Sequence, residues 1–425
     1  MEREYRHTIE QSTESTLAPV LVEFVKWVLR SAGEHGIRRI YFLARDGWPM
    51  YQAARILAEG RDPEIDCRYL KCSRYALRIP AFHLLGRSAV EQICMGGISV
   101  TLRKVLQRGG LTDQEIQETA RAMGRRDDLD RILSYQEVRE LRGPLAQTEL
   151  FWRYVSAHAE EAYGAAVGYL RREGLMDGID YAIADSGWTG SIQRTLSLIT
   201  ASAGYRGRIT GYYFGLYHIP ADAEKKDYHA YYFGPVGKIR RKVYFSNSLF
   251  ECICSEPSRM TVGYRRSGEG YEPAAEEGRI GNREELELIH GIVERRAGEE
   301  AERLPVRPAL WKTDIGRRLL RRLEQLMGRP GRAQAEAFGR MKFTDDVLDA
   351  GHLLAPGLTE WEIRQNHFWA KLLVLTGIRR QPVKESAWIE GSIVRSGGAV
   401  RWHLLQSRIY KYLLYIKKDI LERIK

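Results

Sequence analysis

Residues 39–49, with the sequence RIYFLARDGWP, decide the fold class. Residues 39–44 are typical of a short buried strand, and a turn containing Gly47 follows directly. Pro49 stands early in a helical run over 50–57, where proline is tolerated because first-turn N–H groups have no intrahelical partner. A strand that passes into a helix through a tight turn is the repeating unit of a parallel α/β sheet.

The same alternation continues through the first half of the chain. Apolar residues at helical spacing predict a helix over 17–33. Further strands are predicted at 67–72, 180–184 and 208–216, and further helices at 149–173 and from Ser191 to Leu198. Such units place ligand sites at the carboxyl ends of the strands. We therefore predict an α/β protein with a Rossmann-like parallel sheet.

The remaining residues suggest a division into regions. Residues 84–149 look helical and polar, so we predict a helical insertion between the two parts of the α/β domain, 1–83 and 150–262. Residues 263–425 are predicted to be mostly helical, after an exposed loop at 265–285.

A second strand-to-helix turn, residues 184–191 with the sequence ADSGWTGS, has the composition of an anion site. Gly190 lets the backbone approach a ligand closely, and Thr189 and Ser191 supply hydroxyl groups. The first-turn N–H groups of the following helix supply more donors. Asp185 ends the strand and can accept hydrogen bonds from ribose hydroxyls.

The first turn combines a cation with a carboxylate. The guanidinium of Arg45 suits a pair of phosphate oxygens. Asp46 is unexpected beside an anion, so it must bind a metal, take a proton or bond the backbone. The two turns together suit a molecule with a diphosphate at one end and a phosphate at the other, which is the shape of phosphoribosyl pyrophosphate.

These motifs resemble known families. Residues 41–48 (YFLARDGW) resemble the pyrophosphate loop of type I phosphoribosyltransferases, and residues 183–191 (IADSGWTGS) resemble their ribose-phosphate loop. Together with residues 69–78 (YLKCSRYALR), they are similar to a bacterial family of glycan phosphoribosyltransferases that install ribofuranose in polysaccharides. The resemblance covers residues 15–260. It implies a phosphoribosyltransferase-type sheet, Mg²⁺ with the donor, a glycan acceptor, and a partner haloacid-dehalogenase phosphatase that removes the 5-phosphate.

The resemblance also implies roles for individual residues. The first turn would hold pyrophosphate through Ala44, Arg45, Asp46 and Gly47. The second turn would hold the ribose and the 5-phosphate through Asp185, Ser186, Gly187, Thr189, Gly190 and Ser191. Ser186 departs from the family pattern, which has a second acidic residue there.

Two further groups of residues are candidates for substrate contacts. Cations that follow the second predicted strand could neutralise departing pyrophosphate, namely Lys71, Arg74 and Arg78. Carboxylates and rings in the aromatic-rich region and beyond could hold the acceptor sugar, namely Glu251, Glu256, Tyr244 and Trp388. The alternatives are a solvated helix start for the first group and an aromatic core with surface carboxylates for the second.

The expected reaction is an inverting displacement at C1 of the donor. Asp46 is the first candidate for the base that deprotonates the acceptor hydroxyl, and Asp185 the second; either carboxylate could contact Mg²⁺ through the pyrophosphate. Two other classes stay open. One is a haloacid-dehalogenase phosphatase with Asp185 as nucleophile, although Gly187 occupies its general-acid position. The other is a non-catalytic scaffold of a polysaccharide-assembly complex.

Composition limits the remaining function classes. The net charge of +11 favours anionic partners, but no nucleic-acid-binding motif accompanies it, so we expect no nucleic acid. The five cysteines form no CxxC pair, which disfavours zinc and disulfides. The start of the chain lacks a signal-peptide pattern, so we expect a cytoplasmic protein. Residues 407–425 form a basic amphipathic helix that either packs on its own domain or rests on the inner face of a membrane.

Overall fold

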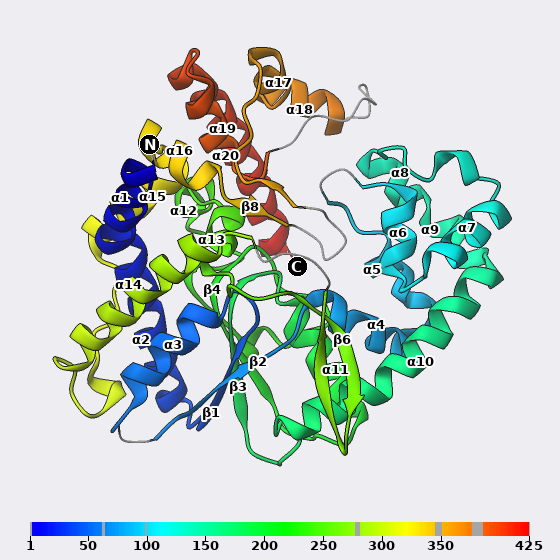
Figure 1. The fold of residues 1–425 in the computed structure, drawn as a ribbon, viewed down its shortest axis with the longest axis horizontal. Helices are drawn as coiled ribbons and strands as arrows, with labels where there is room; N and C mark the ends of the chain where they lie inside the picture. Colours follow the sequence, from blue (N-terminus) through cyan, green and yellow to red (C-terminus); the bar gives the residue numbers. More distant parts are fainter. Residues whose placement is uncertain are drawn as a thin grey trace.

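A five-stranded parallel sheet forms the centre of the computed structural model (Figure 1). The structure describes residues 2–61, 64–97, 100–276, 281–344, 351–375 and 386–424. The strand order is β2-β1-β3-β4-β5, and every neighbouring pair is parallel. The strands are β1 (Arg39–Leu43), β2 (Asp66–Leu70), β3 (Tyr181–Trp188), β4 (Ile209–Leu216) and β5 (Tyr228–Phe233). The predicted parallel α/β sheet is confirmed.

Two strands differ from the sequence-based expectation. β5 was not predicted, because its aromatic-rich sequence, YHAYYF, did not stand out from the tyrosine-rich residues around it. β3 was expected to end at Ala184 but continues to Trp188. It continues because Gly187 pairs with Gly215 of β4, and two facing glycines allow a backbone approach that side chains would block.

Helices cover both faces of the sheet (Figure 1). On one face, α2 (Ala18–Glu34), α3 (Trp48–Ala58) and α14 (Arg283–Ala301) contact one another. On the other lie α4 (Arg74–Leu85), α10 (Glu149–Arg172) and α11 (Ser191–Ser202). The helices predicted at 17–33, 50–57, 149–173 and from Ser191 all appear, with ends that differ by no more than four residues.

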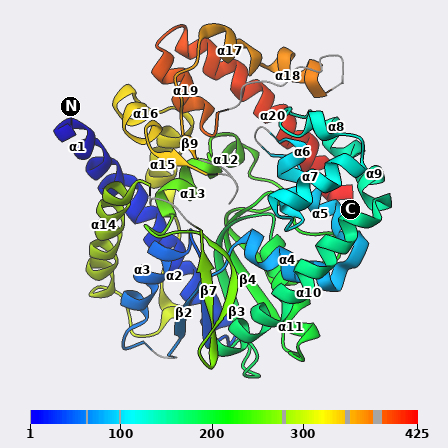
Figure 2. The ribbon, with the colours of Figure 1, turned by 45° about the vertical axis from the view of Figure 1, so that its right-hand side comes forward.

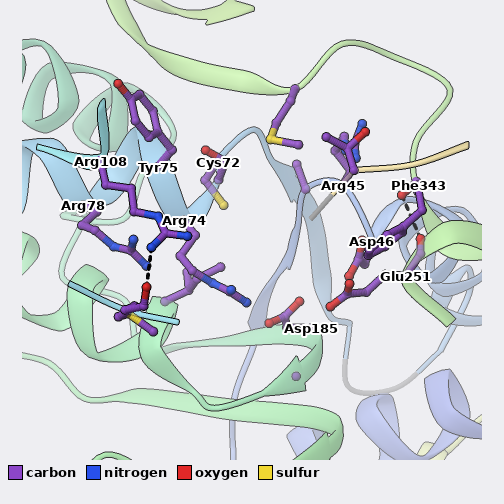
Figure 3. A pocket seen from close by; sticks show the side chains of 18 of the residues that line it. Arg45, Asp46, Cys72, Arg74, Tyr75, Arg78, Arg108, Asp185, Glu251 and Phe343 are labelled. Carbon is purple, nitrogen blue, oxygen red and sulfur yellow. Dashed lines mark hydrogen bonds between the residues drawn. The ribbon is translucent and has the colours of Figure 1, made fainter. Parts of the chain in front are cut away.

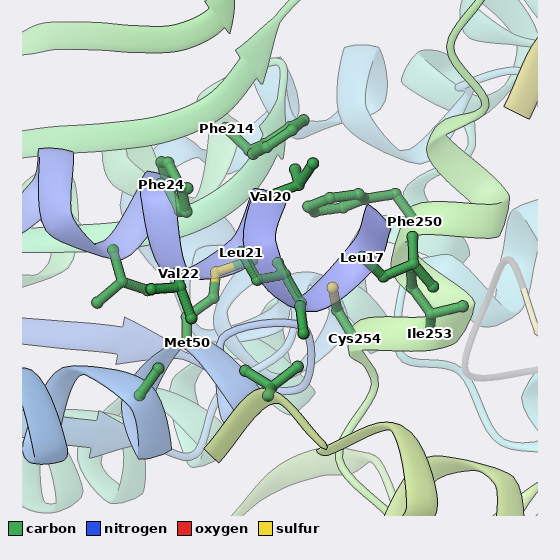
Figure 4. Close-up of a cluster of buried hydrophobic side chains, with 14 of the residues drawn as sticks. Leu17, Val20, Leu21, Val22, Phe24, Met50, Phe214, Phe250, Ile253 and Cys254 are labelled. Atoms are coloured by element: carbon green, nitrogen blue, oxygen red, sulfur yellow. The ribbon is translucent and has the colours of Figure 1, made fainter. Parts of the chain in front are cut away.

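Successive side chains of β1 point into different cores, as the alternation of a strand requires. Ile40 and Phe42 belong to the larger apolar cluster, and Tyr41 and Leu43 to the cluster beneath α4, α10 and α11. Figure 4 shows the larger cluster, where Leu21 and Phe24 of α2 pack near Phe214 of β4. A strand that is buried on both faces has a continuous run of apolar residues. This run explains why β1 could be predicted from the sequence.

The chain between α4 and α10 forms a group of short helices beside the sheet domain (Figure 2). These are α5 (Val90–Ile93), α6 (Leu102–Arg108), α7 (Asp113–Ala122), α8 (Tyr135–Glu140) and α9 (Arg142–Gln147), with 3₁₀ turns at Gly86–Ala89 and Arg126–Asp128. They share an apolar cluster of their own, to which α4 contributes Phe82 and α10 contributes Phe151. We call residues 86–147 the helical insertion.

The region after β5 is mostly helical, with two small antiparallel hairpins. The helices are α12 (Ile239–Val243), α13 (Asn247–Cys254), α15 (Gly316–Gly328), α16 (Arg332–Gly339), α17 (Glu360–Gln365), α18 (Phe368–Leu375), α19 (Ile389–Ser396) and α20 (Val400–Ile424). The hairpins are β6 (Thr261–Ser267) with β7 (Gly270–Ala275), and β8 (Lys342–Phe343) with β9 (His352–Leu353). At the amino end, α1 (Glu2–Ser12) leads through a π-helical turn, Thr13–Leu17, into α2.

The exposed loop predicted at 265–285 is wrong for most of its length. Residues 265–275 belong to the β6–β7 hairpin, and α14 begins at Arg283; residues 277–280 lie outside the described residues. The hairpin turns at Gly268, whose φ of +58° suits glycine. Its glycine-rich, charged sequence looked like a loop because one face of the hairpin is exposed.

None of the helices that the structure describes combines the length and the apolar character needed to cross a lipid bilayer.

Candidate active site

The two turns singled out in the sequence meet at the carboxyl edge of neighbouring strands. β1 leads into Asp46 and β3 contains Asp185 and Ser186, and the two strands pair directly. The hydroxyl of Ser186 donates a hydrogen bond to Oδ2 of Asp46 over 2.6 Å, although the residues are 140 positions apart. A single small molecule can therefore contact both turns.

The turn after β1 is tight enough to require glycine. The N–H of Gly47 donates to the carbonyl of Leu43 over 2.8 Å. A Cβ atom at position 47 would lie 2.5 Å from that same carbonyl oxygen, closer than any side chain allows. Pro49 then occupies the first turn of α3. This geometry directs Arg45 and Asp46 away from the sheet and into the space above β1 and β3.

A cleft of about 240 Å³ occupies that space (Figure 3). Three carboxylates line it, those of Asp46, Asp185 and Glu251. Four guanidinium groups also line it, those of Arg45, Arg74, Arg78 and Arg108. Figure 3 shows Arg74, Arg78 and Arg108 grouped on one side, Asp46 and Glu251 on the other, and Asp185 between them. We call Arg74, Arg78 and Arg108 the cationic wall; the carboxylates of Asp46 and Glu251 lie on the opposite side, together with Arg45.

Burial raises the pKa of both aspartates of the cleft, and the charge of Asp46 adds to the effect on Asp185. Burial and the negative charge of Asp46 together raise the pKa of Asp185 to about 7, although Arg74 and the backbone hydrogen bonds from Ser186 and Gly187 oppose them. Burial also raises the pKa of Asp46, while the hydrogen bond from Ser186 and the charges of Arg45 and Arg74 lower it. Two interacting carboxyl groups of this kind titrate as a pair and can hold or release one proton near neutrality.

The cationic wall comes from two elements. Ser73 caps α4 by accepting a hydrogen bond from the N–H of Ala76 over 2.9 Å, which fixes the first turn. Arg74 and Arg78 lie four residues apart on this helix and therefore share one face. Arg108 ends α6 of the helical insertion, is only 7% exposed, and donates to the carbonyl of Met95 over 2.5 Å.

Arg108 was missed by the sequence reasoning. Its only local signal is that it precedes the Gly109-Gly110 break, which does not indicate a cleft. Its position depends on how the helical insertion packs against α4 and α10, and that packing is a tertiary property.

Glu251, a predicted acceptor contact, does reach the cleft. It lies on α13, and its Oε1 accepts a hydrogen bond from Nε1 of Trp188 over 2.5 Å. Trp188 is the last residue of β3, so this contact attaches α13 to the carboxyl edge of the sheet.

Lys71 and Glu256 were predicted to bind different substrates, but the structure pairs them with each other. Nζ of Lys71 lies 2.5 Å from Oε1 of Glu256, and the hydroxyl of Tyr69 donates to Oε2 over 2.8 Å. The N–H of Glu256 donates to the carbonyl of Arg45 over 3.1 Å. None of these three side chains lines the cleft, and the backbone contact of Glu256 holds the turn that carries Arg45.

The proposed phosphate cradle lies at the start of α11. The hydroxyl of Thr189 donates to that of Ser191 over 3.2 Å, and the next residue, Ile192, lines the cleft. Gly190 has a φ of +62°, and a Cβ there would lie 2.4 Å from the ring of Tyr228. The sequence predicted that a ligand approaches Gly190 closely. On this side of Gly190, the close neighbour is instead the ring of Tyr228 of β5.

Tyr244 and Trp388, the predicted sugar platforms, are not brought to the cleft. The ring of Tyr244 is buried among the guanidinium groups of Arg240, Arg329 and Arg408, at 4.6 to 5.3 Å. Trp388 is fully buried and donates through Nε1 to the carbonyl of Met327 over 2.8 Å. Trp388 belongs to the larger apolar cluster and Tyr244 is enclosed by arginines, so neither ring lines the cleft.

The carboxylates of the cleft suit Mg²⁺ only together with a phosphorylated ligand. Within the described parts of the chain, no cluster of three or more His, Cys, Asp or Glu side chains could hold a metal ion alone. Mg²⁺ is commonly bound by one or two carboxylates plus substrate phosphate oxygens. Asp46 and Asp185 fit that limited role.

Comparison with known proteins adds no assignment: no protein-family model and no curated protein matches this chain.

Proposed function

We propose that this protein is a phosphoribosyltransferase-type enzyme that transfers a 5-phosphoribosyl group from phosphoribosyl pyrophosphate to a glycan hydroxyl and releases pyrophosphate. The observation that supports the proposal is the hydrogen bond between Ser186 and Asp46, which links the two turns beside one cleft that Arg45, Asp46 and Asp185 line. The proposal includes a bacterial polysaccharide as product. It also includes a cytoplasmic location, because a donor with this many negative charges does not cross a bilayer.

The charges of the cleft fit the donor. Arg45 and the cationic wall of Arg74, Arg78 and Arg108 supply donors and positive charge for the diphosphate, whose charge increases as it leaves. Asp185, between the two sides of the cleft, is placed to accept hydrogen bonds from the ribose hydroxyls. Mg²⁺, when bound to the diphosphate with Asp46 or Asp185, would neutralise further negative charge on the leaving group.

The reaction then needs a base on the carboxylate side of the cleft. Departure of pyrophosphate leaves positive charge at C1, and the acceptor hydroxyl attacks from the face opposite the leaving group, with inversion. Asp46 already accepts a hydrogen bond from the hydroxyl of Ser186, which is the contact that a sugar hydroxyl would need. Asp185, with a pKa of about 7, is the second candidate because a base is most effective near the working pH. Glu251, on the same side as Asp46, is placed to orient the acceptor.

The test is pyrophosphate release by Asp46→Ala and Asp185→Ala with donor, Mg²⁺ and an oligosaccharide acceptor. We expect each rate to fall about a hundredfold or more, the usual size of a lost acid–base contribution. Asp180→Ala is the matched control, because Asp180 is exposed just before β3, at the opposite edge of the sheet. Unchanged rates in both cleft variants would rule out the mechanism.

The same protein can be used to test the two alternative functions, a phosphatase and a non-catalytic scaffold. A phosphatase with Asp185 as nucleophile would release phosphate from sugar phosphates without an acceptor, and that result would replace our proposal. A scaffold would show no stabilisation by phosphoribosyl pyrophosphate and Mg²⁺ in a thermal-shift assay, whereas a donor-binding enzyme is stabilised. The 5-phosphate remains on the product, so the proposal also requires a partner phosphatase to remove it.

A further inference from the structure

Among the described residues, the helix α20 has an exposed apolar stripe along its length. Six aliphatic residues, each between 37% and 77% exposed, recur every three or four positions: Leu405, Ile409, Leu413, Ile416, Ile420 and Ile424. That spacing puts them on one side of the helix. Trp402, 55% exposed, extends the stripe toward the start of the helix. At 1.5 Å per residue, the stripe from Trp402 to Ile424 is about 33 Å long.

The opposite side of α20 is firmly packed, so the stripe has a fixed orientation. The ring of Tyr415 stacks on Tyr217 at 5.4 Å between centroids, and Nζ of Lys411 lies 2.5 Å from Glu390. Arg408 lies over the ring of Tyr244 at 5.3 Å. The helix therefore packs on its own domain through one face and presents another face outward.

The charges on the outward side are all positive. Arg401, Lys417 and Arg423 are exposed there, and Lys418, which lies over the ring of Tyr415, is an exposed cation on the other side of the helix. The two acidic residues of α20 are not: Asp419 is buried and accepts hydrogen bonds from the N–H of Gly237 and from Arg423, and Glu422 is half-buried. An apolar stripe with basic flanks and no exposed carboxylate is complementary to an anionic lipid surface.

We propose that α20 is a membrane-surface helix, with its stripe inserted at the headgroup–acyl boundary of an anionic bilayer and its lysines and arginines at the lipid phosphates. A second copy of this chain fits less well. A symmetric dimer through the stripe would crowd basic flanks together, and no exposed carboxylate of α20 could pair with them. Trp369, 69% exposed on α18, which contacts α20, adds an aromatic side chain of the kind enriched at bilayer interfaces.

The stripe and the cleft belong to the same end of the sheet. Tyr217, which stacks on Tyr415 of α20, also lies 6.0 Å from Trp188 between ring centroids. Trp188 in turn donates to Glu251, which lines the cleft. A bilayer bound at α20 would therefore lie at the edge of the sheet where the substrates bind, although lipid binding itself does not depend on the proposed reaction.

Sedimentation with vesicles tests the proposal on the full chain. The probes are vesicles of phosphatidylcholine alone and vesicles of equal parts phosphatidylcholine and phosphatidylglycerol. We expect binding to the anionic vesicles, and an apparent affinity at least about tenfold lower for the double variant Leu413→Asp/Ile416→Asp, because two apolar side chains no longer enter the bilayer. The charge variant Arg401→Glu/Lys417→Glu should weaken binding and remove its salt dependence.

Leu310→Asp is the matched control, because Leu310 is 67% exposed but lies in a 3₁₀ turn outside α20. It should bind vesicles as the wild type does. No sedimentation with anionic vesicles, equal sedimentation with neutral ones, or an equal loss in Leu310→Asp would each overturn the proposal. Light scattering tests the alternative that the stripe is a dimer interface. If the wild type is a dimer and Leu413→Asp/Ile416→Asp is a monomer, the stripe binds a second copy of the chain and not a membrane.

Discussion

At the scale of single residues, the cleft makes the protonation of Asp185 part of the folding equilibrium. Burial and the charge of Asp46 raise its pKa from 3.8 to about 7 in the folded protein. Between these values the folded state holds a proton that the unfolded state has released. The free energy of unfolding contributed by this group therefore falls as the pH rises from about 4 to 7.

Removing the carboxyl charge should remove this dependence. We predict that, as the pH rises from 5 to 8, the Tm of the wild type falls by a few degrees relative to the Tm of Asp185→Asn. The comparison of two pH values cancels any constant effect of the amide on packing. Differential scanning fluorimetry measures the Tm values. The control is Asp180→Asn, because Asp180 is exposed and directly precedes β3. A difference in Tm that stays constant with pH would show that Asp185 is not held protonated.

Sequence reasoning identified the residues of the site whose chemistry depends on local turns. Asp46 follows β1 by three residues and Asp185 lies in the carboxyl half of β3, so the strand predictions were enough to bring both to one edge of the sheet. Sequence reasoning could not, however, predict which side chains contact each other. Lys71 and Glu256 carry opposite charges far apart in the sequence, and only the fold shows that they neutralise each other.

At the scale of the secondary-structure elements, the carboxyl end of β3 depends on a pair of facing glycines. Gly187 has a φ of +133°, and a Cβ there would lie 2.0 Å from the carbonyl oxygen of Gly215. We predict that Gly187→Ala lowers the free energy of unfolding by at least about 2 kcal/mol, because the backbone must move or the strands must separate. Pyrophosphate release should fall as well, since Asp185 and Ser186 directly precede this position.

A second glycine provides the control for that variant. Gly164 lies in α10 with open space around its Cβ position. Gly164→Ala should stabilise the helix by up to about 1 kcal/mol and leave activity unchanged. Chemical denaturation of both variants measures the two effects. If Gly187→Ala is as stable as the wild type, the close approach of β3 and β4 is incorrect.

The elements that sequence reasoning found share a strong local pattern. β1, α2 and α10 have long apolar runs or clear helical periodicity, because they are buried by neighbours on well-defined sides. β5 and the β6–β7 hairpin lacked such a pattern. β5 is one edge strand of the sheet (β2 is the other) and is partly exposed, and the hairpin lies on the surface, so the sequences of β5 and of the hairpin mix aromatic, charged and small residues.

At the scale of the whole molecule, the cleft is completed by a part of the chain that lies outside the sheet. The helical insertion has its own apolar cluster, and α4 and α10 contribute side chains to both that cluster and the one beneath the sheet. These two helices therefore fix the insertion relative to β1 and β3. No local pattern in residues 86–147 could reveal that Arg108 faces Asp185 across a cleft.

The contribution of the insertion to donor binding can be measured at Arg108. If its guanidinium contacts the diphosphate, Arg108→Ala should weaken binding of phosphoribosyl pyrophosphate by about tenfold or more, the usual cost of a lost hydrogen bond to a charged group. Arg121→Ala, an exposed arginine on α7 of the same insertion, should bind as the wild type does. Titration calorimetry gives the affinities, and the Tm of the ligand-free proteins separates the two roles of Arg108. A lower Tm with unchanged affinity would make Arg108 a packing residue that holds Met95, whereas a lost affinity that Arg108→Lys partly restores would place its charge at the donor.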